Sequence, residues 1–443
     1  MSLRDHGLTP RLKPLSARKS ATLSVLDVGT SKVVCLVAEL RPVEPGDALR
    51  GRTHLARVIG IGHQRSAGLK GGAVVDLESA ELAIRQAIHA AERMAKVEVQ
   101  SVIVNLTGGR LGSHRFDGQV PVRAGTVSPG DVGRALEAAS ARTLRPGRAV
   151  IHALPTGFSL DGQRDVVEPA GMVAEKLGVD LHVVTSETAA ARNLMLAVER
   201  SHLGVEAVIA TPYASGLSAL VDDEAEMGVV VVDMGGGTTS AGVFQSGHFV
   251  HADAIAVGGH HVTMDIARGL TTRVSAAERL KTTYGAAVAS PADERDMIAV
   301  PQVDEADDER ELAHHVPKAQ LVRIIRPRVE EILELVRDRL RNAGFSAQAG
   351  RQVVLTGGAS GLAGLPEVAR RVLGAQVRVG RPLGIRGLPD AAKGPAFSAA
   401  VGLLVYPQVA HAEHYEPKGA GFFAGPGSGS YVDRMSRWIR DSF

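Results

Sequence analysis

Residues 228–244 read GVVVVDMGGGTTSAGVF, and this stretch decides the fold. An apolar run ends in Asp233, a glycine-rich turn with two threonines follows, and a second apolar run completes the unit. Branched apolar residues on both sides of such a turn predict strand–turn–strand. Residues 24–37, SVLDVGTSKVVCLV, repeat the arrangement with Asp27 at the corresponding place. The sequence therefore predicts two hairpins of one kind, about two hundred residues apart.

Both predicted turns have the chemistry of a phosphate-binding loop. Glycine reaches positive φ and lets a ligand approach the backbone, so successive N–H groups can form a nest for phosphate oxygens. Asp27 and Asp233 would hold Mg²⁺ mostly through water, because this ion dehydrates reluctantly. A single hairpin of this type is usually turn chemistry alone, and the second copy is what favours phosphate binding. The hydroxyl and ammonium donors of the two turns are Thr30, Ser31, Lys32, Thr238 and Thr239.

A third glycine turn lies at residues 355–362, LTGGASGL, between an apolar strand and a predicted helix. Helix N-termini attract anions, and glycine there lets a flat ligand approach the backbone. The glycine spacing fits neither the dinucleotide-binding fingerprint nor the P-loop. The turn therefore adds a candidate ligand contact outside those two families.

Composition excludes several classes of protein. A chain of 443 residues predicts two or more domains. The net charge of +2 and the 3% aromatic content give no footprint of nucleic-acid binding. The single cysteine, Cys35, lies in an apolar run, which predicts a buried structural thiol in a reducing compartment. His260–His261 and His314–His315 are adjacent pairs, whose side chains point apart and chelate a metal poorly.

Element patterns divide the rest of the chain. Residues 76–97 predict an amphipathic helix with Asp76 as its N-cap. Residues 111–184 change to short strands, turns and one helix, as an inserted domain would. In a long helix near its middle, Pro327 predicts a kink or a break, and Pro407 is expected to stop the last apolar helix.

The last stretch, YVDRMSRWIRDSF at residues 431–443, follows a Gly/Pro/Ser-bearing linker at 408–430. A short helix with Trp on its apolar face and Arg on its polar face is typical of the membrane interface. A helix that docks in a groove of a partner protein would use the same face, so both interpretations stand on chemistry alone. On a helical wheel the apolar arc holds Tyr431, Val432, Met435, Trp438, Ile439 and Phe443, with Arg434, Arg437 and Arg440 opposite.

Taken together, these stretches resemble the FtsA family of actin-like bacterial cell-division proteins, within the actin/sugar-kinase/heat-shock-chaperone ATPase superfamily. The resemblance covers roughly residues 21–408 and extends to the tail. The stretches that carry it include LDVGTSK, EMGVVVVDMGGGTT, IAVGGHHVTMDIARGL, AERLKTTYG, IIRPRVEEILELV, VVLTGGASGLAGL and AFSAAVGLLVYP.

This resemblance implies an α/β, actin-like ATPase fold with two lobes around a nucleotide cleft and an FtsA-type inserted small domain. The implied division is a disordered basic arm at 1–20, a first-lobe core at 21–110, 185–230 and 386–408, the insert at 111–184, a second-lobe core at 231–264 and 351–385, an outer part of the second lobe at 265–350, a linker at 409–430 and a membrane-targeting helix at 431–443.

The resemblance also implies ATP and Mg²⁺ as ligands. Asp27 and Asp233 would hold the hydrated ion, and Glu278 and Lys281 would lie beside the ribose and base, although an ordinary i,i+3 surface pair would look the same. The implied phosphate loops are Gly29, Thr30, Ser31 and Lys32, then Gly235, Gly236, Gly237, Thr238 and Thr239, with Gly357, Gly358 and Ala359 along the adenosine.

Two positions depart from the superfamily pattern near the expected attacking water. Chaperone relatives carry a carboxylate where this chain has Thr211, and many relatives carry Asp where it has Ser240. Neither hydroxyl is a competent general base near neutral pH without an activating partner. We expect weak ATP hydrolysis or none.

The partners implied by the resemblance are the C-terminal peptide of the tubulin-like FtsZ, further copies of the chain in a filament, other divisome proteins and anionic lipids. The implied location is the inner face of the cytoplasmic membrane at the septum. Arg326 and Arg328, with Arg323 nearby, could receive an acidic and apolar peptide, although a solvated helix face is the plain alternative. A PilM-like pilus-assembly protein and a sugar or acetate kinase are the competing functions, and the amphipathic tail argues against the first.

Overall fold

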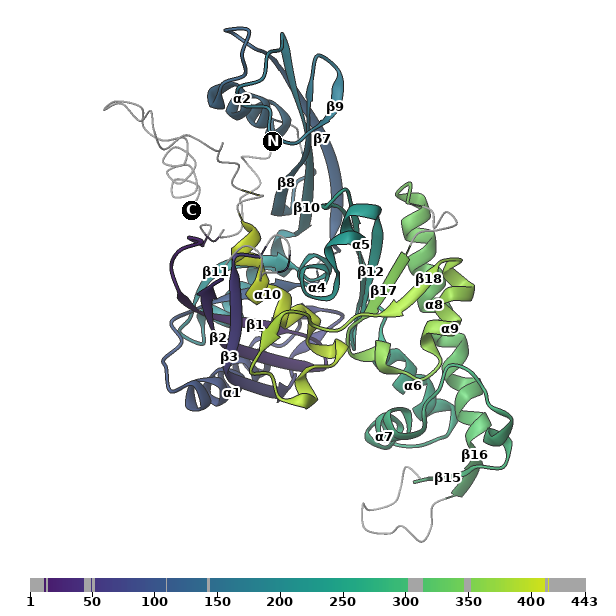
Figure 1. Ribbon diagram of the computed structural model, residues 1–443. Helices are drawn as coiled ribbons and strands as arrows, with labels where there is room; N and C mark the ends of the chain where they lie inside the picture. Colours follow the sequence, from purple (N-terminus) through teal and green to yellow (C-terminus); the bar gives the residue numbers. More distant parts are fainter. Residues whose placement is uncertain are drawn as a thin grey trace.

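The two Asp-terminated strands occupy corresponding places in two sheets of the same design (Figure 1). The computed structural model describes residues 12, 15–43, 49, 52–108, 110–141, 144–301, 314–345, 352–410 and 413. One sheet has the strand order β11-β6-β1-β2-β3-β19 and the other has β14-β13-β12-β17-β18. In each sheet the Asp-terminated strand, β1 or β12, pairs antiparallel with the next strand and parallel with a later one. The repeated strand–turn–strand pattern in the sequence therefore corresponds to two sheets of the same arrangement, one in each lobe.

The two predicted strand–turn–strand units are confirmed as β1 with β2 and β12 with β13. The first sheet comprises β1 (Ala21–Val28), β2 (Lys32–Pro42), β3 (His54–Arg65), β6 (Ser101–Leu106), β11 (Gly204–Ala210) and β19 (Ile385–Arg386). The second comprises β12 (Val229–Met234), β13 (Thr239–Gln245), β14 (His248–Ile255), β17 (Gln352–Thr356) and β18 (Gln376–Val379). Every residue of β12 is buried, which explains its unbroken apolar run, because a central strand covered on both faces has no polar side.

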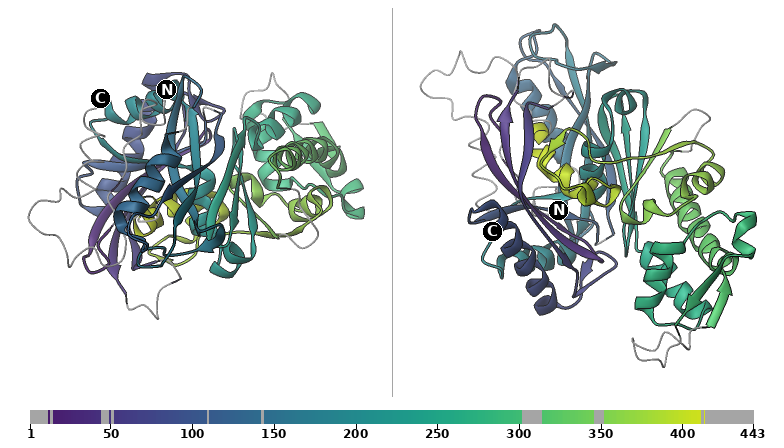
Figure 2. Two further views of the ribbon diagram at one scale, coloured as in Figure 1. Left: turned by 90° about the horizontal axis from the view of Figure 1, so that it is seen from above. Right: turned by 60° about the horizontal axis from the view of Figure 1, so that its bottom comes forward.

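Two helices lie between the sheets. The helix α10 (Ser398–Val409) packs on β1 and β6, whereas α4 (Thr211–Ala219) packs on β12 and β13, and the two helices contact each other closely. In Figure 2 the yellow α10 lies between the purple strands of the first lobe and the green second lobe. The ends of β1 and β12 that carry the two aspartates therefore face a shared space between the lobes.

The predicted helix after Asp76 is confirmed as α1 (Leu77–Ala95). The Asp76 side chain accepts hydrogen bonds from the N–H groups of Glu78 and Ser79, as an N-cap does. The helix lies so close to β3 that a side chain at Gly62 is excluded, since a Cβ there would be 1.7 Å from a helix carbonyl.

The inserted segment forms a four-stranded sheet of order β7-β10-β8-β9 with one helix on it. Its elements are β7 (Gly112–Pro121), α2 (Pro129–Ser140), β8 (Arg148–Leu160), β9 (Gln163–Val166) and β10 (Lys176–Glu187). Three of these strands span 10, 13 and 12 residues, so the expectation of short strands is wrong. Polar and apolar residues do not alternate regularly along these strands. One side of the sheet packs on a separate apolar core, and the base of the sheet contacts the lobes.

Buried histidines join the inserted sheet to the second lobe. His182 on β10 bonds through Nδ1 to the carbonyl of Phe249 on β14 (2.7 Å) and through Nε2 to Ser113 on β7 (2.6 Å). Burial lowers the pKa of His182 to about 3, against the backbone bond to Phe249, which raises it. Burial and the nearby Arg115 lower the pKa of His251 to about 4. Both rings are therefore neutral in the folded chain near neutral pH.

These histidines predict acid-sensitive stability. Histidine in the unfolded chain has a pKa near 6.5. Below that pH the unfolded chain binds protons at these rings, whereas the folded chain does not. The free energy of unfolding therefore falls as the pH falls toward 4. At pH 5 each ring should lower the free energy of unfolding by about 2 kcal/mol. Urea unfolding between pH 7.5 and pH 5 measures this, and His182→Gln should flatten the dependence although Arg115 and His152 still face the site. An unchanged dependence in that variant would contradict the assignment.

The outer part of the second lobe is largely helical. It comprises the end of α6 (Gly259–Gly269), then α7 (Val274–Tyr284), the short turn η2 (Pro291–Glu294), β15 (Met297–Val300), β16 (His314–Pro317) and α8 (Lys318–Asn342). The core helix α9 (Leu365–Leu373) packs on α8 and on β18. One apolar core continues from the second sheet into these helices. The predicted break at Pro327 is wrong, because α8 runs through it with Ile325 and Val329 buried on either side.

The expectation that Pro407 stops the last helix is also wrong. The helix α10 continues to Val409, and the Pro407 carbonyl accepts a hydrogen bond from the Leu15 N–H (3.2 Å). Residues 15–20, assigned above to the basic arm, therefore lie against the first lobe, where His54 also bonds the Lys19 carbonyl. Within the described part of the chain, no helix is long and apolar enough to cross a membrane.

Candidate nucleotide-binding cleft

The two predicted phosphate loops have the same turn and meet each other. In the first, the Gly29 N–H donates to the Lys32 carbonyl (2.9 Å), and in the second the Gly235 N–H donates to the Thr238 carbonyl (2.9 Å). A Cβ at Gly236 would lie 1.8 Å from the Ser31 hydroxyl. The loops can therefore approach this closely only because the second one carries glycine.

Helix α6 holds the second loop from behind. The N–H groups of Gly259 and His260 donate to the carbonyls of Gly235 and Gly236 (2.9 and 2.7 Å). The Thr239 hydroxyl donates to the Val257 carbonyl (2.8 Å), so Thr239 anchors the loop rather than presenting its hydroxyl to the cleft. The predicted residues of this loop thus form one fixed turn at the first turn of a helix.

Both aspartates are buried and hydrogen-bonded. Asp27 accepts from the Asn105 amide (2.6 Å), and Asp233 accepts from the Ser215 hydroxyl on α4. Burial raises the pKa of Asp233 to about 6; the Ser215 bond opposes this shift and the nearby Asp27 adds to it. Burial also raises the pKa of Asp27, with Lys32 and Asn105 opposing. Two carboxylates here destabilise each other's charge.

The donor set fits a hydrated Mg²⁺. A divalent cation between Asp27 and Asp233 would stabilise the charged forms that burial disfavours. Among the described residues no group of three His, Cys, Asp or Glu side chains could hold a metal, so waters and ligand oxygens would have to complete the shell. His260–His261 and His314–His315 belong to no such group among the described residues.

Lys32 of the first loop contacts residues 396 and 397, which belong to the same lobe. Its ammonium donates to the Ala396 carbonyl (2.5 Å) and lies 3.6 Å from the centre of the Phe397 ring. Burial lowers the pKa of Lys32, and Asp27 and Asp233 raise it. The ammonium is therefore the counter-charge of both carboxylates in this structure.

The third glycine turn abuts the second loop. Gly357 has φ of 83°, and a Cβ there would be 2.3 Å from Asp233 Oδ1. The short turn η4 (Gly358–Gly361) follows, and a Cβ at Gly259 would lie 3.0 Å from Ala359 Cβ. The three turns that the sequence singled out therefore lie next to one another.

Glu278 and Lys281 lie beside this turn and are more than a surface pair. Lys281 Nζ donates to Glu278 (2.7 Å), to the Thr263 hydroxyl (2.8 Å) and to the Gly259 carbonyl (3.1 Å). Burial alone would raise the pKa of Glu278, but the bonds from Lys281 and Thr263 leave it lowered. The pair fixes α7 against the start of α6, next to Ala359.

Thr211 and Ser240 lie where the lobes meet. The Thr211 hydroxyl bonds to Thr107 (2.5 Å) and to the Asn105 amide (3.2 Å). Ser240 is the register partner of Asp233 across β12 and β13, and its buried hydroxyl has no hydrogen-bond partner among the described residues. Among the described residues, the partners of Thr211 are an amide and a hydroxyl, and neither group is a base of the kind that activates a water for hydrolysis.

Three polar residues of the cleft were not singled out from the sequence. Asn105 bonds Asp27 and Thr211 and accepts from the Val28 N–H (2.7 Å). Ser215 bonds Asp233, and Thr263 joins Glu278 to Lys281. Asn105 interrupts the apolar strand SVIVNL, and that interruption was the available signal. Ser215 and Thr263 lie inside helices, where the sequence offered no comparable signal.

The candidate partner residues on α8 are engaged in ion pairs. Arg328 binds both oxygens of Asp265 on α6 (2.6 and 3.2 Å) and also Glu331. Arg326 pairs with Glu330 (2.9 Å). An acidic peptide would have to compete with these carboxylates. The predicted membrane residues, Val432 to Phe443, lie outside the described residues.

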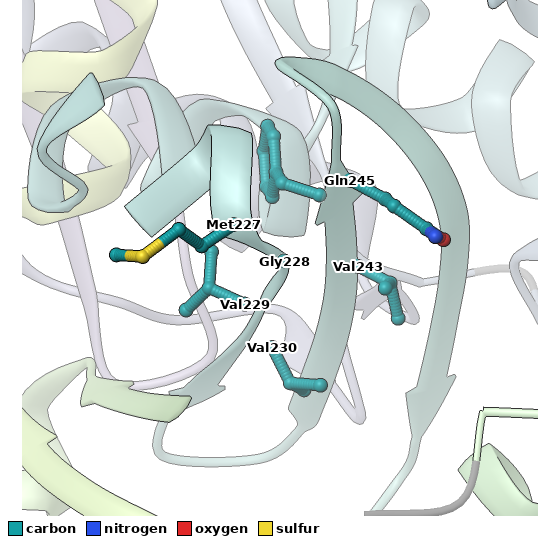
Figure 3. Close-up of a pocket in the computed structure, with 7 residues that line it drawn as sticks. Met227, Gly228, Val229, Val230, Val243 and Gln245 are labelled. Carbon is teal, nitrogen blue, oxygen red and sulfur yellow. The ribbon is translucent and has the colours of Figure 1, made fainter. Parts of the chain in front are cut away.

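A separate shallow pocket lies at the far end of the second hairpin (Figure 3). It is bounded by the start of β12 and the end of β13, whereas the phosphate loop joins their opposite ends. Its lining carries no charged side chain, so it lacks the donors of the cleft. The lining residues are Met227, Gly228, Val229, Val230, Val243, Phe244 and Gln245.

Comparison with known protein families gives two matches along the chain. A family described as "Cell division protein FtsA" matches residues 230–402, and one described as "SHS2 domain inserted in FTSA" matches residues 108–185. The FtsA of Rhizobium meliloti is 53% identical over 434 residues, covering 98% of each chain. The FtsA of Escherichia coli K12 is 33% identical, covering 94% of this chain and 97% of its own.

Solved structures share the fold at low sequence identity. A structure titled "PilM-PilN type IV pilus biogenesis complex" has a TM-score of 0.59 at 17% identity, covering 87% of this chain and 98% of its own. MreB5 of Spiroplasma citri bound to ADP has a TM-score of 0.52 at 14% identity, covering 90% and 100%. The predicted actin-like α/β fold with an inserted domain is confirmed.

Proposed function

Because this chain belongs to the FtsA family of cell division proteins, we propose that it is an ATP-binding, actin-like protein that polymerises on the inner face of the cytoplasmic membrane and tethers FtsZ filaments there. The observation that supports nucleotide binding best is the contact between the two glycine loops, each beside a buried aspartate. Such loops provide the backbone donors that phosphates require.

The proposed binding mode assigns each part of the cleft a role. Backbone N–H groups of the two loops and the hydroxyls of Thr30, Ser31 and Thr238 bind the phosphates, Lys32 adds a charge, and Thr239 holds the second loop in place. Asp27 and Asp233 receive the hydrated Mg²⁺, which supplies charge neutralisation when bound. Gly357, Gly358 and Ala359 line the adenosine, with Glu278 and Lys281 beside the ribose and base.

Hydrolysis is proposed to be slow. Thr211 and Ser240 are the side chains near the expected water, and their partners are hydroxyls, an amide or none among the described residues. Bound nucleotide then acts mainly by stabilising the closed arrangement of the lobes, because a ligand that binds one state raises its population.

The proposed partners follow from the family and from the chemistry of two surfaces. Residues 431–443 would lie in the membrane interface, at the septum. Arg326 and Arg328 would bind the acidic C-terminal peptide of FtsZ by displacing Glu330 and Asp265, and the inserted domain would contact neighbouring copies and other divisome proteins. The domain division given above is proposed unchanged, except that residues 15–20 join the first lobe.

The competing functions rest on fold alone. The similarity to the PilM complex is at 17% identity, whereas relatives of 33 to 53% identity along nearly the whole chain are cell division proteins. A sugar kinase would need a carboxylate base beside its substrate, and Asp27 and Asp233 are the carboxylates that the cleft offers to the metal. We therefore keep the cell-division function.

Replacing Asp233 by Asn is expected to weaken Mg-ATP binding about tenfold, because a charge-assisted contact contributes roughly 1.5–3 kcal/mol. Titration calorimetry of the full chain measures it, with ATP in EDTA as the metal-free arm. The wild type should lose affinity in EDTA, and Asp233→Asn, which keeps only Asp27 for the metal, should lose less. Asp390→Asn, an exposed carboxylate paired with Lys393, is the control. Equal wild-type affinity with and without Mg²⁺ would remove the metal from the proposal.

A further inference from the structure

His152 is a buried side chain that the nucleotide site does not use. It lies on β8 of the inserted sheet with no solvent exposure, and both ring nitrogens are engaged. The Ala210 N–H donates to Nε2 (2.9 Å), so Nε2 is the acceptor nitrogen. In a neutral ring the other nitrogen then carries the proton. His152 Nδ1 therefore donates to Glu413 Oε1, 2.7 Å away.

One side of His152 leads to the cleft. Ala210 is the N-cap of α4, and the next residue is Thr211. Thr211 shares the Asn105 amide with Asp27 (3.2 and 2.6 Å). A continuous series of buried hydrogen bonds and one peptide unit thus joins the proposed metal ligand Asp27 to the His152 ring.

The other side leads to the C-terminal segment. Glu413 follows α10, is buried, and also accepts from the Tyr406 hydroxyl (3.2 Å). The rings of Tyr213 and Tyr406 lie 5.2 and 6.2 Å from the His152 ring. Glu413 is the last residue that the structure describes, and the linker and amphipathic stretch follow it in sequence. The carboxylate therefore holds Glu413, the residue from which this segment continues in sequence, against β8 and α10.

We infer that His152 couples nucleotide occupancy of the cleft to the anchoring of the C-terminal segment at Glu413. The inference rests on the proposed nucleotide site. A ligand that binds at Asp27 acts through its hydrogen-bonded partners Asn105 and Thr211 on the position of the Ala210 N–H, and through that group on the ring that bonds Glu413. A buried donor or acceptor that loses its partner costs free energy. The His152–Glu413 hydrogen bond is therefore either formed or replaced by another bond, and is not lengthened gradually. Coupling of binding sites is reciprocal, so loosening Glu413 must weaken nucleotide binding equally.

The test uses the full chain and Mg-ATP. Glu413→Ala removes the acceptor, Glu413→Gln keeps an acceptor oxygen for the His152 Nδ1–H and the Tyr406 hydroxyl, and Asp390→Ala is the control. Mg-ATP affinity should fall about fivefold in Glu413→Ala and stay within about twofold of wild type in the other two. Hydrogen exchange of the peptide spanning residues 398–413 should slow on adding Mg-ATP in wild type and Glu413→Gln, and not in Glu413→Ala.

The outcomes separate the two proposals. Wild-type affinity and slowed exchange in Glu413→Ala would overturn the coupling and leave the nucleotide site intact. Absence of Mg-ATP binding by the wild type would overturn the proposed function and this inference with it. Should Glu413→Ala fail to fold, Glu413→Asp keeps the charge, withdraws the carboxylate by one methylene group, and is expected to show the same loss of coupling. Wild-type Mg-ATP affinity together with slowed exchange in Glu413→Asp would contradict the proposed coupling.

Discussion

A chain that ends at Ser430 is expected to stay in the supernatant under conditions where the full chain sediments with anionic liposomes and Mg-ATP. On the helical wheel predicted for the removed stretch, residues 431–443, Trp438 and Phe443 fall on one arc and the arginines on the other. Apolar burial at the interface and attraction to anionic headgroups both disappear with it. Because a short helix binds weakly, sedimentation of the full chain should rise steeply where filaments present many copies.

Two controls make the experiment specific to lipid. Replacing Trp438 by Ser removes apolar area without changing charge, and it should reduce sedimentation at every salt concentration. Replacing Arg434, Arg437 and Arg440 by Gln should remove the preference for anionic over zwitterionic liposomes, and with it the sensitivity to salt. Sedimentation of the truncated chain at the wild-type level would assign the tail to a protein partner instead.

Local pattern was enough to predict the duplicated core of this fold. Each hairpin has an apolar run, an Asp at the end of that run and a glycine turn. These short-range signals placed β1, β2, β12 and β13 correctly. The helix α1 followed from an N-cap and a 3.6-residue period. The inserted strands were predicted too short, because their polar and apolar sides are set by contacts with two lobes rather than by alternation alone.

The contacts that complete the cleft join residues far apart in sequence. Asn105 is 78 positions from Asp27 and 106 positions from Thr211. No periodicity or spacing encodes such pairs, because they depend on how finished sheets pack. Pro407 does not end the last helix. Burial of the residues around it stabilises the helix by more than the one backbone hydrogen bond that proline removes. The residues assigned to phosphate, metal and adenosine remain predictions that the arrangement of the three turns supports.

Gly402 is expected to reverse the usual effect of glycine in a helix. In an exposed helix, Gly→Ala stabilises by roughly 1 kcal/mol. Gly402 lies inside α10, where a Cβ would be 1.7 Å from the Ala214 carbonyl oxygen of α4 and 2.3 Å from its carbon. Backbone atoms cannot rotate away as a side chain can, so the two helices must separate. We expect Gly402→Ala to lower the free energy of unfolding by about 3 kcal/mol, the upper part of the range for overpacking.

Urea unfolding followed by circular dichroism measures this loss, with Gly394→Ala as the matched control. A Cβ at Gly394 meets nothing within 4 Å and its φ is −76°, so that substitution should leave stability unchanged or slightly raised. The displaced helix carries Thr211 and Ser215, the partners of Asn105 and Asp233. Gly402→Ala should therefore also weaken Mg-ATP binding in the fraction that folds. Equal stability of the two variants would mean that α4 and α10 are not in this close contact, and the position of the Asp233 partner would have to be assigned anew.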